Sequence, residues 1–294
     1  MSFLVGTVLL AVVTAVACAL PGVFVVLRRG SMLVDAISHA VLPGIVVGYF
    51  FTHDLDSPLL ILGAALAGLV VVLGSEYLGR SGLVTGDAPQ GLVFPALFSV
   101  GVILVTLNFA NVHLDTHAVL VGDLNLAAFD QATLAGISIG PSYLYVMLGV
   151  LLLNLTFIAA CYPRLTVTSF DPLFARSLGI GVRRLDTVFM FLVSLTVTAA
   201  FHAAGAILVV ALVVVPAATA HLLASRLLVM LALTVGIAAG GALAGFWLAY
   251  ALDAATSAGM AVFYGLCFTL TLLGTRLDRR HRRRAARRQP LPVS

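Results

Sequence analysis

Asp35 and His39 are the first candidates for a functional site, because this ionisable pair lies within an almost continuously apolar stretch of the chain. Residues four positions apart share one face of a helix, so the carboxylate and the imidazole would point the same way. They would offer an oxygen and a nitrogen ligand to a borderline divalent metal ion. An aspartate in a bilayer helix costs about 2.5–3.5 kcal/mol, so its presence predicts a functional site.

Pro43 supports this interpretation, while the position of Asp35 near a helix start leaves a simpler one open. Proline lacks an N–H, so Pro43 leaves the carbonyl of His39 without its usual helix partner. Inside a membrane, such carbonyls are tolerated where they line a cavity or find another donor. Alternatively, Asp35 could favour the positive end of the helix dipole, and His39 would then be incidental.

A single copy of the pair supplies too few ligands for tight metal binding. One Asp and one His give two ligands, whereas a transition metal prefers about four to six. Two copies across a twofold axis would present two carboxylates and two imidazoles, a set suited to Mn²⁺, Fe²⁺ or Zn²⁺. The sequence therefore predicts a dimeric site, whose second copy is identical or a paralogue.

Membrane-spanning helices must position this pair. Hydrophobic residues make up 61% of the chain and charged residues 10%, against about 25% charged in soluble domains. Windows of about 17–25 apolar residues, long enough to cross a bilayer, can be placed at 3–27, 33–51, 58–79, 91–107, 142–161, 185–201, 204–223, 227–250 and 256–275. We expect an all-α polytopic membrane protein with nine transmembrane helices, or eight, since two windows are barely separated near residue 202.

The arginines predict the orientation of the chain. All 16 basic residues are arginine, and they fall in alternate connections and in the C-terminal tail. The connections 52–57, 108–141, 202–203 and 251–255 carry none. By the positive-inside rule the N-terminus is outside, the tail is cytoplasmic and the span count is odd. We expect a transmembrane domain over 1–275 and a disordered basic tail over 276–294, which reflects a membrane surface and topology signal, not a nucleic-acid site.

The connection 162–184 is predicted to dock a partner on the cytoplasmic side. Asp171 can cap a short helix that begins at Pro172 and ends at Gly179. Leu173, Phe174 and Leu178 would then be apolar contacts at helical spacing, able to fill a groove on a cytoplasmic subunit. An amphipathic helix lying on the lipid surface is the alternative.

The chain has no lysine, which bears on its energy source. A P-loop needs a lysine to reach the phosphates, so any ATP chemistry must come from a partner chain. Gradient-driven transporters usually carry ionisable residues in several helices and broken inverted repeats. The sequence shows one strong intramembrane pair and no clear repeat, which favours a permease driven by a separate ATPase.

Five segments spread through nearly the whole chain form an ordered set. They are Asp35-Ala-Ile-Ser-His-Ala-Val-Leu-Pro-Gly44, Gly91-Leu-Val-Phe-Pro-Ala-Leu-Phe-Ser-Val-Gly101, Val112-His-Leu-Asp-Thr-His-Ala-Val-Leu-Val-Gly122, Phe170-Asp-Pro-Leu-Phe-Ala-Arg-Ser-Leu-Gly179 and Gly205-Ala-Ile-Leu-Val-Val-Ala-Leu-Val-Val-Val-Pro-Ala-Ala-Thr219. In these segments and their order the chain resembles the membrane permease subunits of ABC importers for manganese, zinc and iron.

The resemblance implies an ABC importer permease architecture and assigns two sites. It places the metal gate on Asp35 and His39. It also implies a permease dimer, a cytoplasmic ABC ATPase dimer and an extracytoplasmic metal-binding protein, with the permease itself not an enzyme and no cofactor bound permanently. The contacts with the ATPase would be made by Phe170, Asp171, Pro172, Leu173, Phe174, Ala175, Leu178 and Gly179.

Other polar residues have two interpretations each. His113, Asp115, His117 and His202 lie in outer connections, where they are weak contacts for an incoming metal or ordinary loop polarity. Family members often have an acid at the position of His117 and an aromatic at that of Val121, so the resemblance assigns no external metal contact there.

Metal identity is predicted less sharply than transport. The amino-acid sequence of residues 38–44 resembles the manganese and iron branch of the family more than the zinc-specific branch. We therefore expect Mn(II) as the transported metal, with Zn(II) or Fe(II) as alternatives. A gradient-driven metal transporter and a membrane scaffold without transport activity are the other hypotheses, and the first of them predicts transport without any ATPase.

Overall fold

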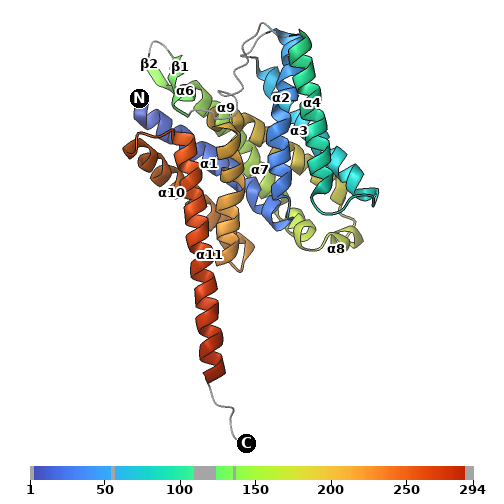
Figure 1. Cartoon of the computed structure of the whole chain (residues 1–294), viewed down its shortest axis with the longest axis vertical. Coiled ribbons are helices and arrows are strands. Elements are labelled where there is room, and N and C mark those ends of the chain that lie inside the picture. Colours follow the sequence, from blue (N-terminus) through green and yellow to red (C-terminus); the bar gives the residue numbers. More distant parts are fainter. Residues whose placement is uncertain (1–2, 54–56, 109–123, 135–136, 289–294) are drawn as a thin grey trace, which may run out of the picture.

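The computed structural model describes residues 3–53, 57–108, 124–134 and 137–288 of the chain, and these residues form a helical bundle (Figure 1). Within these described ranges, eight helices are long and apolar enough to cross a membrane. They are α1 (Phe3–Leu27), α2 (Ser31–Thr52), α3 (Pro58–Arg80), α4 (Ala88–Asn108), α7 (Ser142–Phe170), α9 (Val182–Leu223), α10 (Leu227–Ala251) and α11 (Thr256–Arg288).

The smaller elements lie near the ends of the bundle. They are α6 (Leu124–Phe129), the antiparallel strands β1 (Gln131–Leu134) and β2 (Ile137–Pro141), and α8 (Pro172–Ser177). The ring of Phe129 in α6 lies 4.8 Å from that of Phe3, so α6 covers the start of α1. Figure 1 shows α8 at the opposite end of the bundle, which is also the end from which α11 projects. The sequence did not predict the strand pair.

Helix α9 is folded back on itself, which decides the number of crossings. Its residue Gly205 has φ 75° and ψ 166°, a conformation open to glycine alone, so two helices meet there. Two contacts with α1 show this reversal: Arg28 hydrogen-bonds to Asp186, and a Cβ on Gly22 would lie 1.9 Å from the Val213 carbonyl oxygen. Residues 22 and 28 are about 9 Å apart along a helix. Residues 186 and 213 would be about 40 Å apart in a straight helix, so α9 must turn back to place both beside the same stretch of α1.

The two halves of α9 therefore cross the bundle in opposite directions, as Figure 1 also shows. Counting them separately turns the eight candidate helices into nine apolar segments, the larger of the two expected numbers.

Small residues bring α2 and α3 into close contact. A Cβ on Gly44 would lie 2.3 Å from the Ala64 Cα, and one on Gly63 would lie 2.8 Å from the Gly44 carbonyl oxygen. On the neighbouring helix α4, a Cβ on Gly101 would lie 2.8 Å from the Pro43 Cβ. Close backbone approach of this kind is how helices associate in a membrane, where apolar burial gives no drive. The result is a tightly packed unit of α2, α3 and α4.

Two predicted boundaries are wrong. The window ending at 161 stops too early, because α7 continues through Pro163 to Phe170 and packs Leu165, fully buried, and Thr168, 6% exposed, in the protein. Proline biases a helix toward a stop, but tertiary packing overrides this bias.

The tail is the second correction, because residues 276–288 continue α11 instead of forming a disordered segment. Arginine and alanine are good helix formers, and extending an existing helix avoids the cost of nucleation.

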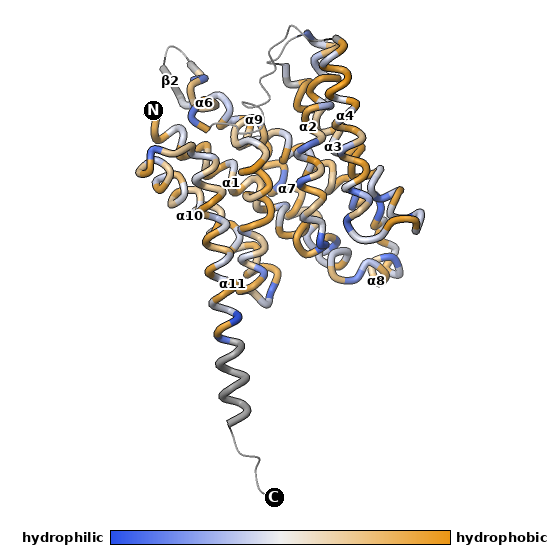
Figure 2. The backbone as a smooth tube through the Cα atoms, viewed as in Figure 1, coloured by the Kyte–Doolittle hydropathy of each residue, from blue (hydrophilic) through white to orange (hydrophobic). Residues whose placement is uncertain are grey.

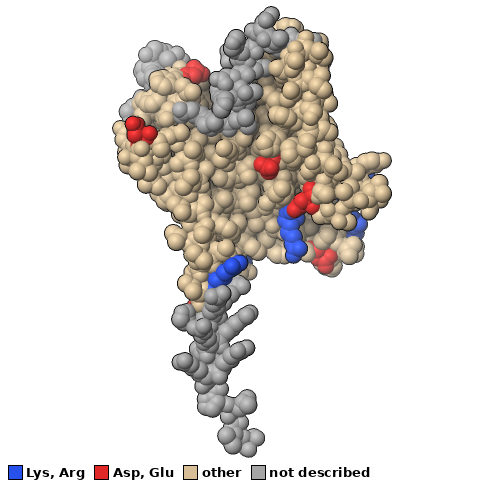
Figure 3. All heavy atoms as spheres, in the orientation of Figure 1, with Lys and Arg blue, Asp and Glu red and all other residues tan. Residues whose placement is uncertain are grey.

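The surface reflects the apolar composition of the chain. Figure 2 shows apolar residues over most of the helices, and Figure 3 shows a broad uncharged face. The arginines that Figure 3 colours lie toward the end that carries α8. On this face the positive charge therefore gathers toward one end of the bundle.

Candidate functional site

Asp35 and His39 lie on one face of α2, as their spacing predicted. The Asp35 Oδ1 and His39 Nε2 atoms are 3.7 Å apart, and the two side chains are 43% and 36% exposed. The first turn of α2 contains no acidic residue, so Asp35 lies beyond it. Because the dipole effect falls off within that turn, the simpler interpretation of Asp35 loses its main support.

Two aromatic side chains of α4 pack against the imidazole of His39. The ring of His39 stacks on Phe94, with centroids 5.2 Å apart, and meets Phe98 edge-on at 6.4 Å. The sequence argument quoted both phenylalanines within a signature segment but gave them no role. Their i, i+4 spacing on a helix was the available signal, because it places both rings on the same face.

The part of α2 that carries Asp35 and His39 is packed against its neighbours. Ala36 follows Asp35, Ala40 follows His39, and both alanines pack with Val71 of α3 in a small buried cluster. Pro43 lies inside α2 and meets Gly101 of α4. Asp35 and His39 are thus fixed by the helix and its neighbours, while their polar ends remain partly exposed.

Among the residues that the structure describes, no group of three or more His, Cys, Asp or Glu side chains could hold a metal ion. Asp35 and His39, which we call the gate pair after the role proposed for them below, would offer one oxygen and one nitrogen ligand. A tightly bound transition metal needs further ligands from another source.

The short helix α8 forms as the sequence predicted. The Asp171 carboxylate accepts hydrogen bonds from the backbone N–H groups of Leu173 (3.1 Å) and Phe174 (2.9 Å), and Pro172 occupies the first helical position. Gly179 follows the helix with φ 74°, a left-handed conformation that suits a helix end. The cap is predictable from sequence because each interaction is local.

The outer face of α8 is apolar and exposed. Phe170, Leu173, Phe174 and Leu178 are 65%, 74%, 53% and 57% exposed, whereas Ala175 is fully buried. These exposed apolar side chains, on α8 and directly beside it, could contact either a partner subunit or the lipid surface, the two alternatives that the sequence left open.

The predicted outer contacts are only partly placed. His113, Asp115 and His117 lie outside the described residues. His202 is exposed next to the fold-back of α9, and its ring lies 4.8 Å from that of Tyr143. The Tyr143 hydroxyl donates a hydrogen bond to the Ala199 carbonyl at 2.7 Å, which ties α7 to α9 at this point.

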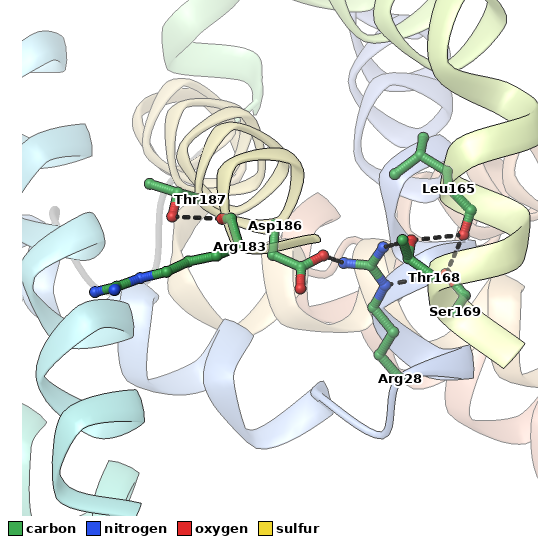
Figure 4. Close-up of polar contacts among 7 residues, drawn as sticks. All are labelled: Arg28, Leu165, Thr168, Ser169, Arg183, Asp186 and Thr187. Carbon is green, nitrogen blue, oxygen red and sulfur yellow. Dashed lines mark hydrogen bonds and ion pairs between the residues drawn. The ribbon is translucent and has the colours of Figure 1, made fainter. Parts of the chain in front are cut away.

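Sequence reasoning missed a polar network at the end of α1 (Figure 4). The Arg28 guanidinium donates hydrogen bonds to Asp186 (2.8 Å), Ser169 (3.0 Å) and Thr168 (3.0 Å). It also lies 4.9 Å from the centre of the Phe189 ring. Burial lowers the pKa of Arg28 from its ordinary value, and the Asp186 carboxylate opposes this shift.

Comparison with known proteins extends over nearly the whole chain. The family model described as "ABC 3 transport family" matches residues 1–275. The manganese transport system membrane protein MntD of Bacillus subtilis is 41% identical over 273 residues, which cover 93% of this chain and 92% of that protein. The zinc transport system membrane protein TroD of Treponema pallidum is 44% identical over 266 residues, which cover 90% of this chain and 72% of that protein.

A solved structure has the same arrangement of helices. In the structure titled "PsaBC from Streptococcus pneumoniae in complex with Fab", the matching chain is 26% identical to this one and superposes with a TM-score of 0.76. The match covers 92% of this chain and 91% of that chain.

Proposed function

The chain belongs to the ABC 3 transport family, and from that premise we propose that it is the permease subunit of an importer for a divalent transition metal. Mn(II) is our first candidate for the cargo and Zn(II) the second. Relatives named for manganese and for zinc match this chain over similar lengths and at similar identity, so their names support a metal cargo without separating the two.

The observation that carries the proposal is the gate pair within a helix long and apolar enough to span a membrane. Its carboxylate and imidazole lie 3.7 Å apart at their nearest atoms and are partly exposed on an otherwise apolar helix. A carboxylate offsets part of the cost of stripping water from a dication, and the imidazole adds a nitrogen ligand. In the proposed mechanism a metal ion passes through a ring of such ligands.

Dimerisation completes this ring. Because the described part of one chain offers two ligands at the gate, a second permease, identical or paralogous, would double them. The resulting set of two oxygens and two nitrogens suits Mn(II), Fe(II) or Zn(II) better than a soft cation such as Cu(I).

ATP hydrolysis would be supplied by a cytoplasmic ABC ATPase dimer that docks on α8. The apolar side chains of Phe170, Leu173, Phe174 and Leu178 are exposed there without a covering element in the described chain. Since the sequence contains no lysine and hence no P-loop, this chain does not bind ATP through that motif.

The orientation follows from charge. The chain is a multi-pass protein of the plasma membrane, and α8 lies at the end where the arginines gather. By the positive-inside rule we place α8 and the end of α11 in the cytoplasm, with α6, β1 and β2 outside. An extracytoplasmic metal-binding protein would then deliver the ion to the outer end.

Reconstitution tests this function. The permease, its ATPase and its binding protein are placed in proteoliposomes, and uptake of Mn(II) and Zn(II) is measured with and without ATP. ATP-dependent uptake of either metal supports the proposal, and the faster metal at equal free concentration identifies the cargo. Uptake by the permease alone, without ATP or ATPase, would instead show a gradient-driven transporter.

A further inference from the structure

Arg28 lies where α1, α7 and α9 meet, and it donates one hydrogen bond to each of three side chains. Its Nη1 donates to Asp186 in α9, and its Nε and Nη2 donate to Ser169 and Thr168 in α7 (Figure 4). The Arg28 side chain is 13% exposed and that of Asp186 is 42% exposed. A largely buried cation with three side-chain partners is well determined in position.

The two hydroxyl acceptors on α7 are oriented by hydrogen bonds of their own. The hydroxyls of Thr168 and Ser169 both donate to the Leu165 carbonyl, at 3.1 and 2.7 Å. Their hydrogens are therefore engaged, and their lone pairs are free to accept from the guanidinium (Figure 4). The planar fork of arginine can meet these two hydroxyls and a carboxylate at once, whereas a lysine ammonium is a point charge without that geometry.

On one side, this network is joined directly to α8. Ser169 precedes the last residue of α7, Phe170, and α8 begins at Pro172. After α8, the chain reaches α9 at Val182, and Asp186 lies in the first turns of that helix. The chain segments on both sides of α8 therefore contact Arg28.

On the other side, Arg28 is joined to the helix that carries the gate pair. Arg28, Arg29 and Gly30 are the whole connection between α1 and α2. Backbone hydrogen bonds from these three residues to Phe24, Val26 and Val25 hold the turn closed. A connection this short transmits a displacement of Arg28 to the start of α2, four residues before Asp35.

We propose that Arg28 is a positioning residue that couples movement of α8 to the gate pair through its bonds to Thr168, Ser169 and Asp186. This inference rests on the proposed function and adds a route by which ATP hydrolysis in an ATPase docked on α8 moves α2. The route consists of packed, hydrogen-bonded groups from one site to the other, which is the physical requirement for coupling.

The test measures transport and ATP hydrolysis together in the reconstituted complex of permease, ATPase and binding protein. Arg28→Gln keeps a hydrogen-bonding side chain but removes the positive charge and the planar guanidinium group with its several N–H donors. We expect the number of ATP molecules hydrolysed per metal ion to rise about tenfold, within the range typical of coupling between two sites. Metal-stimulated ATPase activity and assembly with the ATPase should persist.

Two further variants keep the test decisive if Arg28→Gln does not fold. Thr168→Val combined with Ser169→Ala preserves the ion pair and removes the α7 side of the network, and we expect a rise of about fivefold in the same ratio. Arg28→Lys should lie between this variant and wild type. Arg226→Gln is the matched control, because Arg226 is an exposed arginine at the same end of the bundle, and its ratio should equal that of wild type.

The possible outcomes distinguish failure of the coupling role from failure of the proposed metal-import function. If wild type shows no ATP-driven metal uptake, the proposed function fails and the coupling role fails with it. If wild type transports metal but uptake and hydrolysis fall in parallel in the Arg28 and the Thr168/Ser169 variants, Arg28 is merely structural and this inference alone is overturned.

Discussion

The gate pair and the Arg28 network are both polar contacts on apolar helices, yet they differ in how completely their groups are bonded. Asp35 and His39 are 3.7 Å apart and more than a third exposed. Arg28 makes three side-chain hydrogen bonds of 2.8 to 3.0 Å and is 13% exposed.

The difference indicates two roles. A site that binds and releases a metal ion must leave its ligand atoms available, because groups that already bond to one another must first break that bond. A contact that passes movement from one helix to another benefits from full hydrogen bonding, because each hydrogen bond restricts the movement of the side chain. We therefore expect substitutions at the gate pair to abolish transport with little effect on stability, and those in the Arg28 network to weaken coupling and lower stability while the protein still folds and assembles.

The largest effect is expected at the gate. Asp35→Asn retains shape but removes the charge that offsets the dication, and His39→Ala removes a nitrogen ligand. Each should lower metal uptake at least about a hundredfold, since even residues that only support a metal ligand cost 10–100-fold in affinity. The double variant should be no worse than either single one, because residues that form one site lose function together.

Uptake in cells or proteoliposomes measures this effect, with expression and assembly checked by detergent-solubilised complex formation. Val47→Ala, at an exposed apolar position of the same helix, is the control and should transport normally. Uptake by the double variant near the wild-type rate would refute the gate assignment.

The second prediction contrasts the stabilities of the two regions. Asp186→Ala leaves the Arg28 cation without its carboxylate, and we expect a loss of about 2 kcal/mol, less than for a fully buried pair because Asp186 is 42% exposed. Asp35→Ala should change stability by less than about 0.5 kcal/mol. Thermal unfolding of the purified variants compares them, and equal losses would show that the two regions do not differ in this way.

The third prediction concerns α8, which links the two regions. Phe174→Asp puts a charge into the proposed apolar contact with the ATPase and should weaken association about tenfold or more. Co-purification of the ATPase and uptake measure the result, and Ser177→Asp on the same helix is the matched charge control. Unchanged association would mean that α8 lies on the lipid surface and does not dock a partner.

The smallest effect is expected from the aromatic wall of the gate. Phe94→Leu removes the ring that stacks on His39 at 5.2 Å, so the imidazole should sample more orientations. An aromatic contact of this kind contributes about 0.5–1.5 kcal/mol, which corresponds to a loss of about three- to tenfold in apparent metal affinity. Phe98→Leu should cost less, because its ring is farther away at 6.4 Å. Concentration dependence of uptake distinguishes the two.

Local features of this protein were predictable from sequence alone. Apolar length located the membrane helices, because a run of about 20 apolar residues spans a bilayer as a helix that satisfies its own backbone groups. The i, i+4 spacing of Asp35 and His39 placed them on one face, and the Asp171-Pro172 pair with Gly179 predicted α8. Each of these inferences depends on residues within a few turns of one another.

The tertiary structure alone decided which distant residues meet. Arg28 and Asp186 are 158 positions apart, so no local pattern pairs them, and their contact arises because the first half of α9 packs beside the end of α1. In the same way, packing of α4 on α2 brings Phe94 to His39, and packing of α7 overrides the stop that Pro163 would predict. Sequence determined the helices and their chemistry because these follow from local bonding and hydrophobicity, whereas the contacts between helices depend on how nine apolar surfaces fit together.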